Sequence, residues 1–158
     1  MNKDATVNLL DFLPEGAILL DLKGQNKKEI LKEMVQILSG AHQVKNSNGI
    51  LDALLEREEL GSTGIGQGIA IPHGKSESVG KVVAALGFSK KGIDFDALDG
   101  EPVYLFFMLV APPNAAGIHL KILAKISRLL KDKFFRQALR EAKTPEETLK
   151  LIRDENEY

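Results

Sequence analysis

The chain has 158 residues, of which 44% are hydrophobic and 27% are charged, and its formal net charge is -1. These values are typical of an ordinary globular domain that buries about two-thirds of its unfolded surface, and they give no reason to expect a nucleic-acid partner. The chain contains no cysteine, which excludes disulfides, thiol catalysis and thiolate metal sites.

The N-terminal segment lacks the uninterrupted apolar core of a signal peptide, because Lys3, Asp4 and Asp11 interrupt it. The longest apolar run, Val103–Val110, is far shorter than the roughly 20 residues that span a bilayer. We therefore expect a cytoplasmic protein without membrane insertion. No repeat, low-complexity tract or linker divides the chain, so residues 1–158 are predicted to form a single domain.

The first half of the chain predicts a short strand and two helices. A short apolar run at 17–20 is followed by a helix that opens at Asn26, with Glu29 in the place of a capping-box partner. Ser47 or Asn48 is predicted to open a second helix, which ends at about residue 58.

A glycine-rich loop follows, and it leads to the first candidate site. Four glycines stand within the eight positions of Gly61–Gly68, which is costly unless the backbone needs close approach or positive φ there. Ile69–Ile71 is predicted to be a buried strand that ends at Pro72, since proline has no amide hydrogen for a ladder. His73 would then lie at a rigid strand end, beside loop amides that could converge on an anion.

The second half supplies the two strongest strand signals and three helices. Residues 82–88 and 103–110 are predicted strands, and the latter is apolar on both faces, as is typical of a central strand. Helices are expected over about 118–130 and around 134–139. The last helix begins at Thr144–Glu147, which combines an N-cap threonine, a first-position proline and a capping-box glutamate. The pattern predicts an α/β fold, a mixed sheet covered by helices.

His73 has two interpretations on position alone: a reactive residue, or a polar residue at the rim of a turn. A bound nucleotide is disfavoured, because Ile69 stands where both a dinucleotide fingerprint and a P-loop require glycine. A Ser-His-Asp hydrolase is disfavoured as well, because the chain has no G-x-S-x-G elbow and Ser62 follows a helix.

His119 opens an apolar helix face that Ile122 and Ile126 continue, so its side chain is predicted to point inward. A hydrogen-bonded core histidine is the more common outcome for such a position. The functional alternative is a phosphate-binding imidazole at a helix N-terminus, where the helix dipole favours an anion.

Arg57 lies beside an apolar face at the C-terminal end of its helix. It is either a solvated arginine that complements the helix dipole or a fork for phosphate oxygens. His42 has no neighbouring cluster and is predicted to be a surface residue.

The segments Arg57–Gly66, Gly68–Gly74 and His119–Ala124 closely resemble the enzyme IIA domain of the phosphoenolpyruvate-dependent phosphotransferase system, fructose/mannitol type. This type includes the nitrogen-regulatory IIA proteins. The resemblance covers nearly the whole chain, with Ile93–Asp99 in the family's order. It implies the family's fold and identifies His73 as the histidine that takes a phosphoryl group from the phosphohistidine of a small phosphocarrier protein and passes it on.

The resemblance also implies that His119 and Arg57 lie around the phosphorylated histidine. Ser62 and Thr63 match the family's hydroxyl pair and, with Gly74, are expected to bind phosphate. The scheme needs no cofactor and no metal, and two distant histidines without a carboxylate at ligand spacing are poor evidence for zinc.

The residue types suit this chemistry. A large fraction of an imidazole with an ordinary pKa of about 6.5 is neutral at cytoplasmic pH, and can attack without a separate base. Phosphoryl transfer passes through a loose transition state, so positioning and charge stabilisation dominate. We expect Arg57, His119 and the loop amides to supply both.

The downstream partner follows from what the chain lacks. IIB domains of this system commonly use a phosphocysteine, and the absence of cysteine leads us to expect a IIA unit alone. Its partners are then regulatory proteins, or a separate IIB component in fructose or mannitol transport. Gly74–Lys75 favours the nitrogen-regulatory group.

Overall fold

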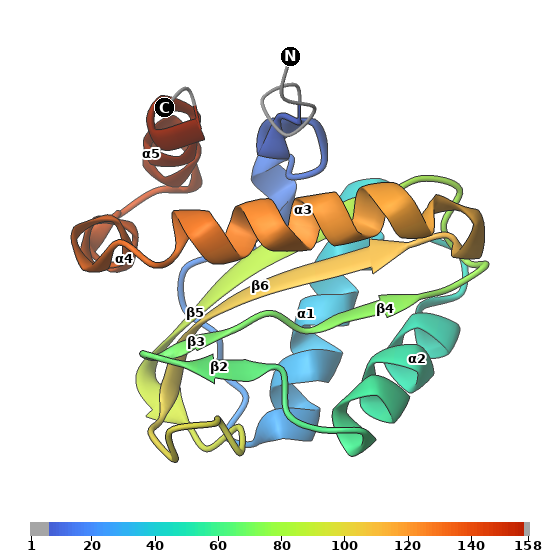
Figure 1. Ribbon diagram of the computed structural model, residues 1–158, viewed down its shortest axis with the longest axis horizontal. Coiled ribbons are helices and arrows are strands. Elements are labelled where there is room, and N and C mark those ends of the chain that lie inside the picture. The colour runs from blue at the N-terminus through green and yellow to red at the C-terminus, as the bar shows by residue number, and fades with distance from the viewer. Residues whose placement is uncertain (1–6, 157–158) are drawn as a thin grey trace.

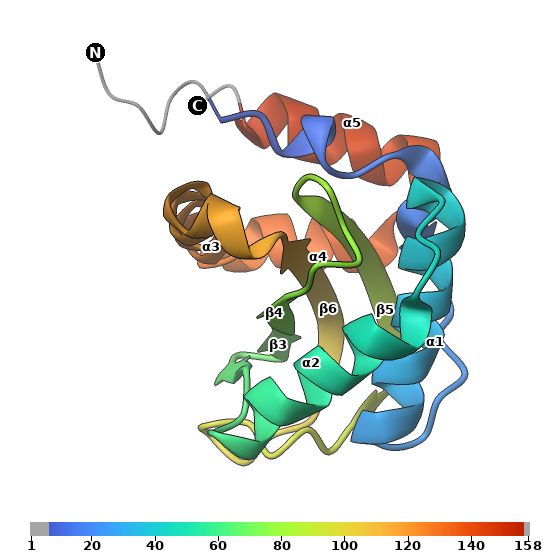
Figure 2. The ribbon, with the colours of Figure 1, turned by 90° about the vertical axis from the view of Figure 1, so that its right-hand side faces the viewer.

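A mixed sheet forms the middle layer of the protein in the computed structural model, which describes residues 7–156 (Figure 1). The helices are α1 (Lys27–His42), α2 (Ser47–Glu59), α3 (Ala116–Leu129), α4 (Lys133–Glu141) and α5 (Pro145–Asn156). The strands are β1 (Ile18–Leu19), β2 (Gly64–Gly66), β3 (Ile69–Ala70), β4 (His73–Lys75), β5 (Val83–Ile93) and β6 (Val103–Ala111). Helices α1 and α2 cover one face of the sheet and α3 and α4 the other, as the side view in Figure 2 shows. Helix α5 packs on α4 and on the short turns near the N-terminus.

The sheet order is β1-β5-β6-β3-β2, and β4 also pairs with β6, beyond the end of β3. β5 and β6 are antiparallel, whereas β3 and β4 run parallel to β6. The predicted mixed sheet is therefore confirmed. So is the central place of β6, in which every residue except Tyr104 is buried.

The glycine-rich segment differs from the prediction of a loop. Part of it forms β2, which pairs antiparallel with β3 through a tight turn at Gln67 and Gly68. Both turn residues have positive φ, 59° and 79°, which is the backbone of a type I′ hairpin. The sequence hid this hairpin because glutamine is an uncommon residue at the first turn position.

The predicted strand Ile69–Ile71 is shorter than expected. It ends at Ala70, and after Pro72 the chain rejoins the same sheet as β4, where His73 pairs with Leu109 of β6. The proline therefore interrupts the ladder, and the chain on either side of it stays beside β6.

The helix starts agree with their sequence signals. Asn26 accepts a hydrogen bond from the Glu29 amide (2.9 Å), and Thr144 accepts one from the Glu147 amide (3.1 Å). Helix α2 begins at Ser47, one of the two predicted starts, and Asn46 caps it. Strand β5 also runs beyond residue 88 to Ile93, past an irregularity in its pairing with β6.

Candidate functional site

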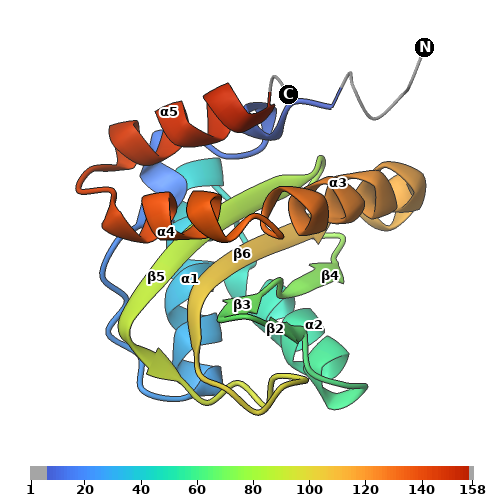
Figure 3. The ribbon, with the colours of Figure 1, turned by 60° about the vertical axis from the view of Figure 1, so that its left-hand side comes forward.

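The candidate site lies where β4 begins, between α2 and α3 (Figure 3). β4 is held from behind by β6, since the Leu109 amide donates to the Pro72 carbonyl (2.9 Å) and His73 sits opposite Leu109. The His73 side chain is partly buried. The sequence predicts His73 just beyond a strand end, whereas the structure places it in the sheet as the first residue of β4.

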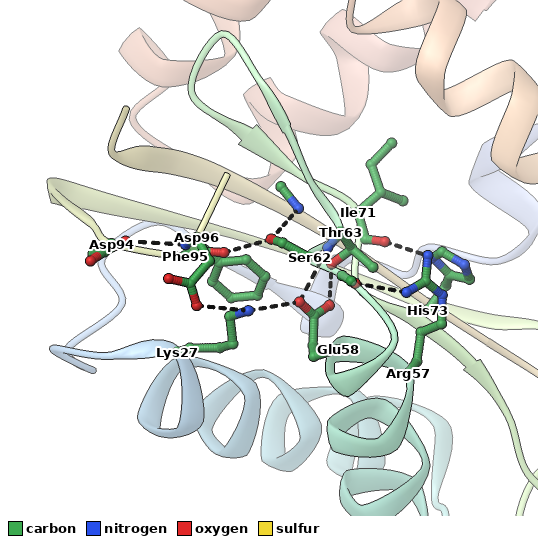
Figure 4. A network of polar contacts seen from close by, with 12 residues as sticks. Lys27, Arg57, Glu58, Ser62, Thr63, Ile71, His73, Asp94, Phe95 and Asp96 are labelled. Atoms are coloured by element: carbon green, nitrogen blue, oxygen red, sulfur yellow. Dashed lines mark hydrogen bonds and ion pairs between the residues drawn. The ribbon is translucent and has the colours of Figure 1, made fainter. Parts of the chain in front are cut away.

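A backbone hydrogen bond fixes the orientation and the tautomer of His73. Its Nδ1 atom lies 2.8 Å from the carbonyl oxygen of Ile71 (Figure 4). A carbonyl oxygen can only accept, so Nδ1 carries the hydrogen. In the neutral ring the lone pair is then on Nε2, which is the nitrogen available to attack an electrophile.

His119 comes to the same place from α3. Its imidazole is only 4% exposed, and the two ring centroids lie 5.7 Å apart with the planes at 68°. Its buried Nε2 atom makes no hydrogen bond within the part of the chain that the structure describes. The predicted inward orientation is confirmed, but the ring is not a fully hydrogen-bonded core histidine.

Both imidazoles are less basic than usual. Burial lowers the pKa of His73 below its ordinary value and Arg57 adds to this effect, while the hydrogen bond to Ile71 and the charge of Glu58 oppose it. Burial, helped by His73 and Lys75, lowers the pKa of His119 to about 4. Both rings are therefore neutral at pH 7, and His73 keeps its nucleophilic lone pair.

Arg57 brings a positive charge to His73. It lies half-buried in the last turn of α2, and its Nη1 atom donates to the Gly61 carbonyl (2.8 Å). The guanidinium is close enough to His73 to lower the pKa of that imidazole. Because one bond to Gly61 uses only part of its donor fork, the side chain can contact a phosphoryl group on His73 as well.

The two hydroxyls that precede the histidine have protein partners. Ser62 donates to the Phe95 carbonyl (2.6 Å) and accepts from the Gly64 amide (3.0 Å). Thr63 is only 3% exposed, and its hydroxyl donates to the Glu58 carboxylate. Both hydroxyls thus shape the loop.

Gly74 lies within β4 opposite Val110, with Ala53 and Leu54 of α2 beside its Cα atom. A Cβ atom added there would meet these residues at 3.6 Å, which is ordinary van der Waals contact. A role of Ser62, Thr63 or Gly74 in binding phosphate stays a prediction.

The sequence analysis missed Glu58 and Lys27, which form an ion pair beneath the site. The Lys27 Nζ atom lies 3.1 Å from a Glu58 carboxylate oxygen and 4.7 Å from the centre of the Phe95 ring. Glu58 is 8% exposed, and it continues the buried stripe of Ile50 and Leu54 at intervals of four. That spacing is the signal that could have found it, because a carboxylate on a buried face needs a partner.

His42 is corrected. It is half-buried at the end of α1, where its Nε2 atom donates to the Ala84 carbonyl (3.0 Å), and burial lowers its pKa. The Ala84 carbonyl that it contacts belongs to β5, and β6 lies between β5 and β4 in the sheet order, so the structure brings together His73, His119 and Arg57 without it. Between residues 7 and 156 no helix is long and apolar enough to cross a membrane.

Comparison with known proteins identifies the family. The family model described as "Phosphoenolpyruvate-dependent sugar phosphotransferase system, EIIA 2" matches residues 11–155. The chain belongs to this family. The resemblance carried by the glycine-rich segment is thus confirmed, and the chain is an EIIA domain of the phosphotransferase system.

Relatives of this EIIA domain fall into two groups. The chain is 40% identical over 135 residues to a nitrogen regulatory protein of Bradyrhizobium diazoefficiens. This alignment covers 84% of the chain and 86% of that relative. It is 36% identical over 146 residues to the fructose-specific EIIABC component of Bacillus subtilis, covering 92% of the chain but only 23% of that longer protein.

A solved structure confirms the fold. The crystal structure of nitrogen regulatory protein IIA-Ntr from Neisseria meningitidis matches with a TM-score of 0.85 at 35% identity, over 91% of the chain and 98% of that structure. The mixed sheet with helices on both faces is therefore the EIIA fold.

Proposed function

We propose that this EIIA domain is a phosphohistidine carrier in which His73 accepts a phosphoryl group from the phosphohistidine of an upstream carrier protein. The hydrogen bond between His73 Nδ1 and the Ile71 carbonyl carries this proposal, because it leaves Nε2 as the free nucleophile. The lowered pKa of His73 supports it, since the ring stays neutral and reactive at pH 7.

The transfer requires one bond to form and one to break. The Nε2 lone pair of His73 attacks phosphorus, and the donor's imidazole leaves with the electrons of its own phosphorus–nitrogen bond. No proton need move when the donor ring carries a hydrogen on its other nitrogen: that ring leaves as a neutral imidazole, and His73, whose Nδ1–H stays bonded to the Ile71 carbonyl, takes up the positive charge as a phosphorylated imidazolium. Arg57 and His119 flank the incoming group, and we assign them to the oxygens of the phosphoryl group, which carry the charge in the loose transition state.

Exposed apolar residues suit the docking of protein partners here. Leu60, at the Arg57 end of α2, is 86% exposed, and Leu120, next to His119 on α3, is 68% exposed. Large apolar side chains left in solvent beside a reactive group favour transient contact with another protein. We propose the upstream carrier as one such partner and a IIB component or a regulatory protein as the other, in the cytoplasm.

Mass spectrometry tests the carrier function directly. The protein is incubated with phosphoenolpyruvate and the two upstream phosphotransferase proteins, and its intact mass is measured. We expect wild type and the control His42→Ala to gain one phosphoryl group and His73→Ala to gain none. The bond should be labile in acid and stable in base, as a phosphoramidate is. A phosphoryl gain on His73→Ala would refute the assignment.

For the biological role we favour nitrogen-type regulation, because the nitrogen regulatory relative is 40% identical and the nitrogen regulatory structure matches with a TM-score of 0.85. Sugar transport is the second candidate, supported by the fructose-specific relative. Pull-downs with His73→Ala and with the phosphorylated wild type separate the two. Regulatory proteins captured by only one form support regulation, whereas capture of only carrier and IIB proteins by both forms supports transport.

A further inference from the structure

A continuous series of contacts links the buried ion pair to the reactive histidine. The Glu58 carboxylate accepts hydrogen bonds from both the amide (3.1 Å) and the hydroxyl of Thr63. The Thr63 carbonyl accepts from the Ile71 amide (3.0 Å), and the Ile71 carbonyl accepts from His73 Nδ1 (2.8 Å). Figure 4 shows these residues, with Lys27 joined to Glu58 on one side and to Asp96 on the other.

Each contact constrains the next one. Thr63 lies at the start of the hairpin and is held at both its amide and its hydroxyl, so its peptide cannot rotate freely. The same residue holds the Ile71 peptide, whose amide and carbonyl lie on the path to His73. The direction of the Ile71 carbonyl, and with it the choice of tautomer at His73, therefore depends on where Glu58 sits.

Burial makes this anchor strong. Glu58 is almost inaccessible to water, so its charge is compensated by Lys27 and by the two Thr63 donors. Lys27 itself is placed by a second carboxylate, Asp96, at 3.4 Å and by the face of Phe95. A buried carboxylate that has lost these partners is costly, so the arrangement tolerates little movement.

We propose that Glu58 is a positioning residue for phosphoryl transfer: the Lys27–Glu58 pair, acting through Thr63 and Ile71, holds His73 with its hydrogen on Nδ1 and its Nε2 lone pair free. This inference rests on the proposed function of His73. Glu58 itself touches neither the donor nor the phosphoryl group. Its loss therefore lowers the rate of transfer within the complex and leaves binding of the donor unchanged.

Two measurements test the proposal, and the first needs no phosphoryl donor. Nitrogen-15 NMR of the histidine rings above the pKa of His73 reports which ring nitrogen carries the hydrogen. We expect the Nδ1–H tautomer in wild type and a mixture of both tautomers in Glu58→Ala. Glu58→Gln keeps an acceptor for the Thr63 amide and should stay close to wild type.

The second measurement is the rate of phosphorylation against the concentration of the phosphorylated upstream carrier. For Glu58→Ala we expect kcat to fall about 10- to 100-fold at unchanged KM. The analogy is with metal sites, where loss of the group that hydrogen-bonds the other ring nitrogen of a metal-binding histidine has an effect of this size. Lys27→Met, which leaves α2 intact, should lower kcat in the same direction by less. Glu59→Gln, on the exposed neighbour of Glu58, is the matched control and should match wild type.

The outcomes are separable. A merely structural Glu58 would reduce the fraction of protein that folds and takes phosphate, but not the tautomer or the kcat of that fraction. Wild-type tautomer and kcat in a folded Glu58→Ala protein would overturn the proposal. If Glu58→Ala does not fold, the same two readouts on Lys27→Met decide, with Glu58→Gln as the conservative control: a wild-type tautomer and kcat in Lys27→Met would overturn the proposal. If wild type takes no phosphate, the carrier function fails, while the tautomer measurement still tests the positioning.

Discussion

The imidazole of His119 lies edge to face with that of His73, at 5.7 Å between centroids, although the two residues come from different elements, α3 and β4. Two protonated imidazoles this close would repel each other. Burial and the neighbouring His73 together lower the pKa of His119 to about 4. The neutral His119 can therefore stand beside a neutral His73 and interact with a phosphoryl group once one arrives.

His119→Ala should still become phosphorylated, but on the order of 100-fold more slowly, because one stabilising group at the developing charge is lost. His119→Gln carries an amide near the position of Nε2 and should recover part of the rate. Single-turnover phosphorylation measured by intact mass gives both values. Wild-type rates in both variants would show that His119 is only a packing residue.

Arg57→Ala should also slow phosphorylation by about 100-fold, since the guanidinium charge beside His73 is lost. Arg57→Lys keeps the charge but not the planar fork that bonds Gly61, so we expect only partial recovery. The same assay applies, with Arg153→Ala on the exposed face of α5 as the control. Equal rates for Arg57→Ala and Arg153→Ala would contradict the assignment.

The pKa of His119 predicts a pH dependence of stability. Unfolded His119 binds a proton below about pH 6.5, whereas the folded residue does so only below about 4. The unfolded state therefore binds more protons in this window, and stability falls as the pH falls through it. Between pH 6.5 and 5 this residue should lower the free energy of unfolding by about 2 kcal/mol.

Urea unfolding at both pH values tests that figure, with His119→Gln as the comparison. The variant should lose about 2 kcal/mol less than wild type over the same interval, since the other titrating groups are common to both. Equal losses in the two proteins would show that His119 is protonated as readily in the fold as in the unfolded chain.

Two glycines near the site should respond differently to alanine. A Cβ atom at Gly64 would lie 3.0 Å from the Cα and Cβ atoms of Ala97, so we expect Gly64→Ala to destabilise the fold by about 1–3 kcal/mol. At Gly74 the nearest atoms, in Ala53 and Leu54, are 3.6 Å away, so Gly74→Ala should stay within about 0.5 kcal/mol of wild type. Thermal unfolding checks both, and a larger loss for Gly74→Ala would contradict the packing argument.

Sequence analysis identified the residues whose amino-acid type alone indicates their structural role. The apolar run of β6 predicted a central strand, and the glycines before His73 marked an unusual backbone. Glu58 carried a weaker signal, because its importance depends on Lys27, 31 residues earlier, which only the packing of α1 on α2 brings beside it. The hairpin was missed for a local reason, since Gln67 adopts a positive φ that its side chain does not favour.

The Nε2 atom of His119, which has no hydrogen-bond partner among residues 7–156, bears on how firmly the proposed carrier holds its phosphoryl group. A buried polar atom without a partner costs about 1–3 kcal/mol, and that cost falls on the unphosphorylated protein. Phosphoryl oxygens on His73 would supply the missing partner, so the phosphorylated form is stabilised relative to the empty one. The group-transfer potential of this phosphohistidine should then lie below that of an exposed one. The equilibrium of phosphoryl transfer between the upstream carrier and this protein would accordingly favour phosphorylation of this protein. It could then stay phosphorylated between encounters with its acceptors.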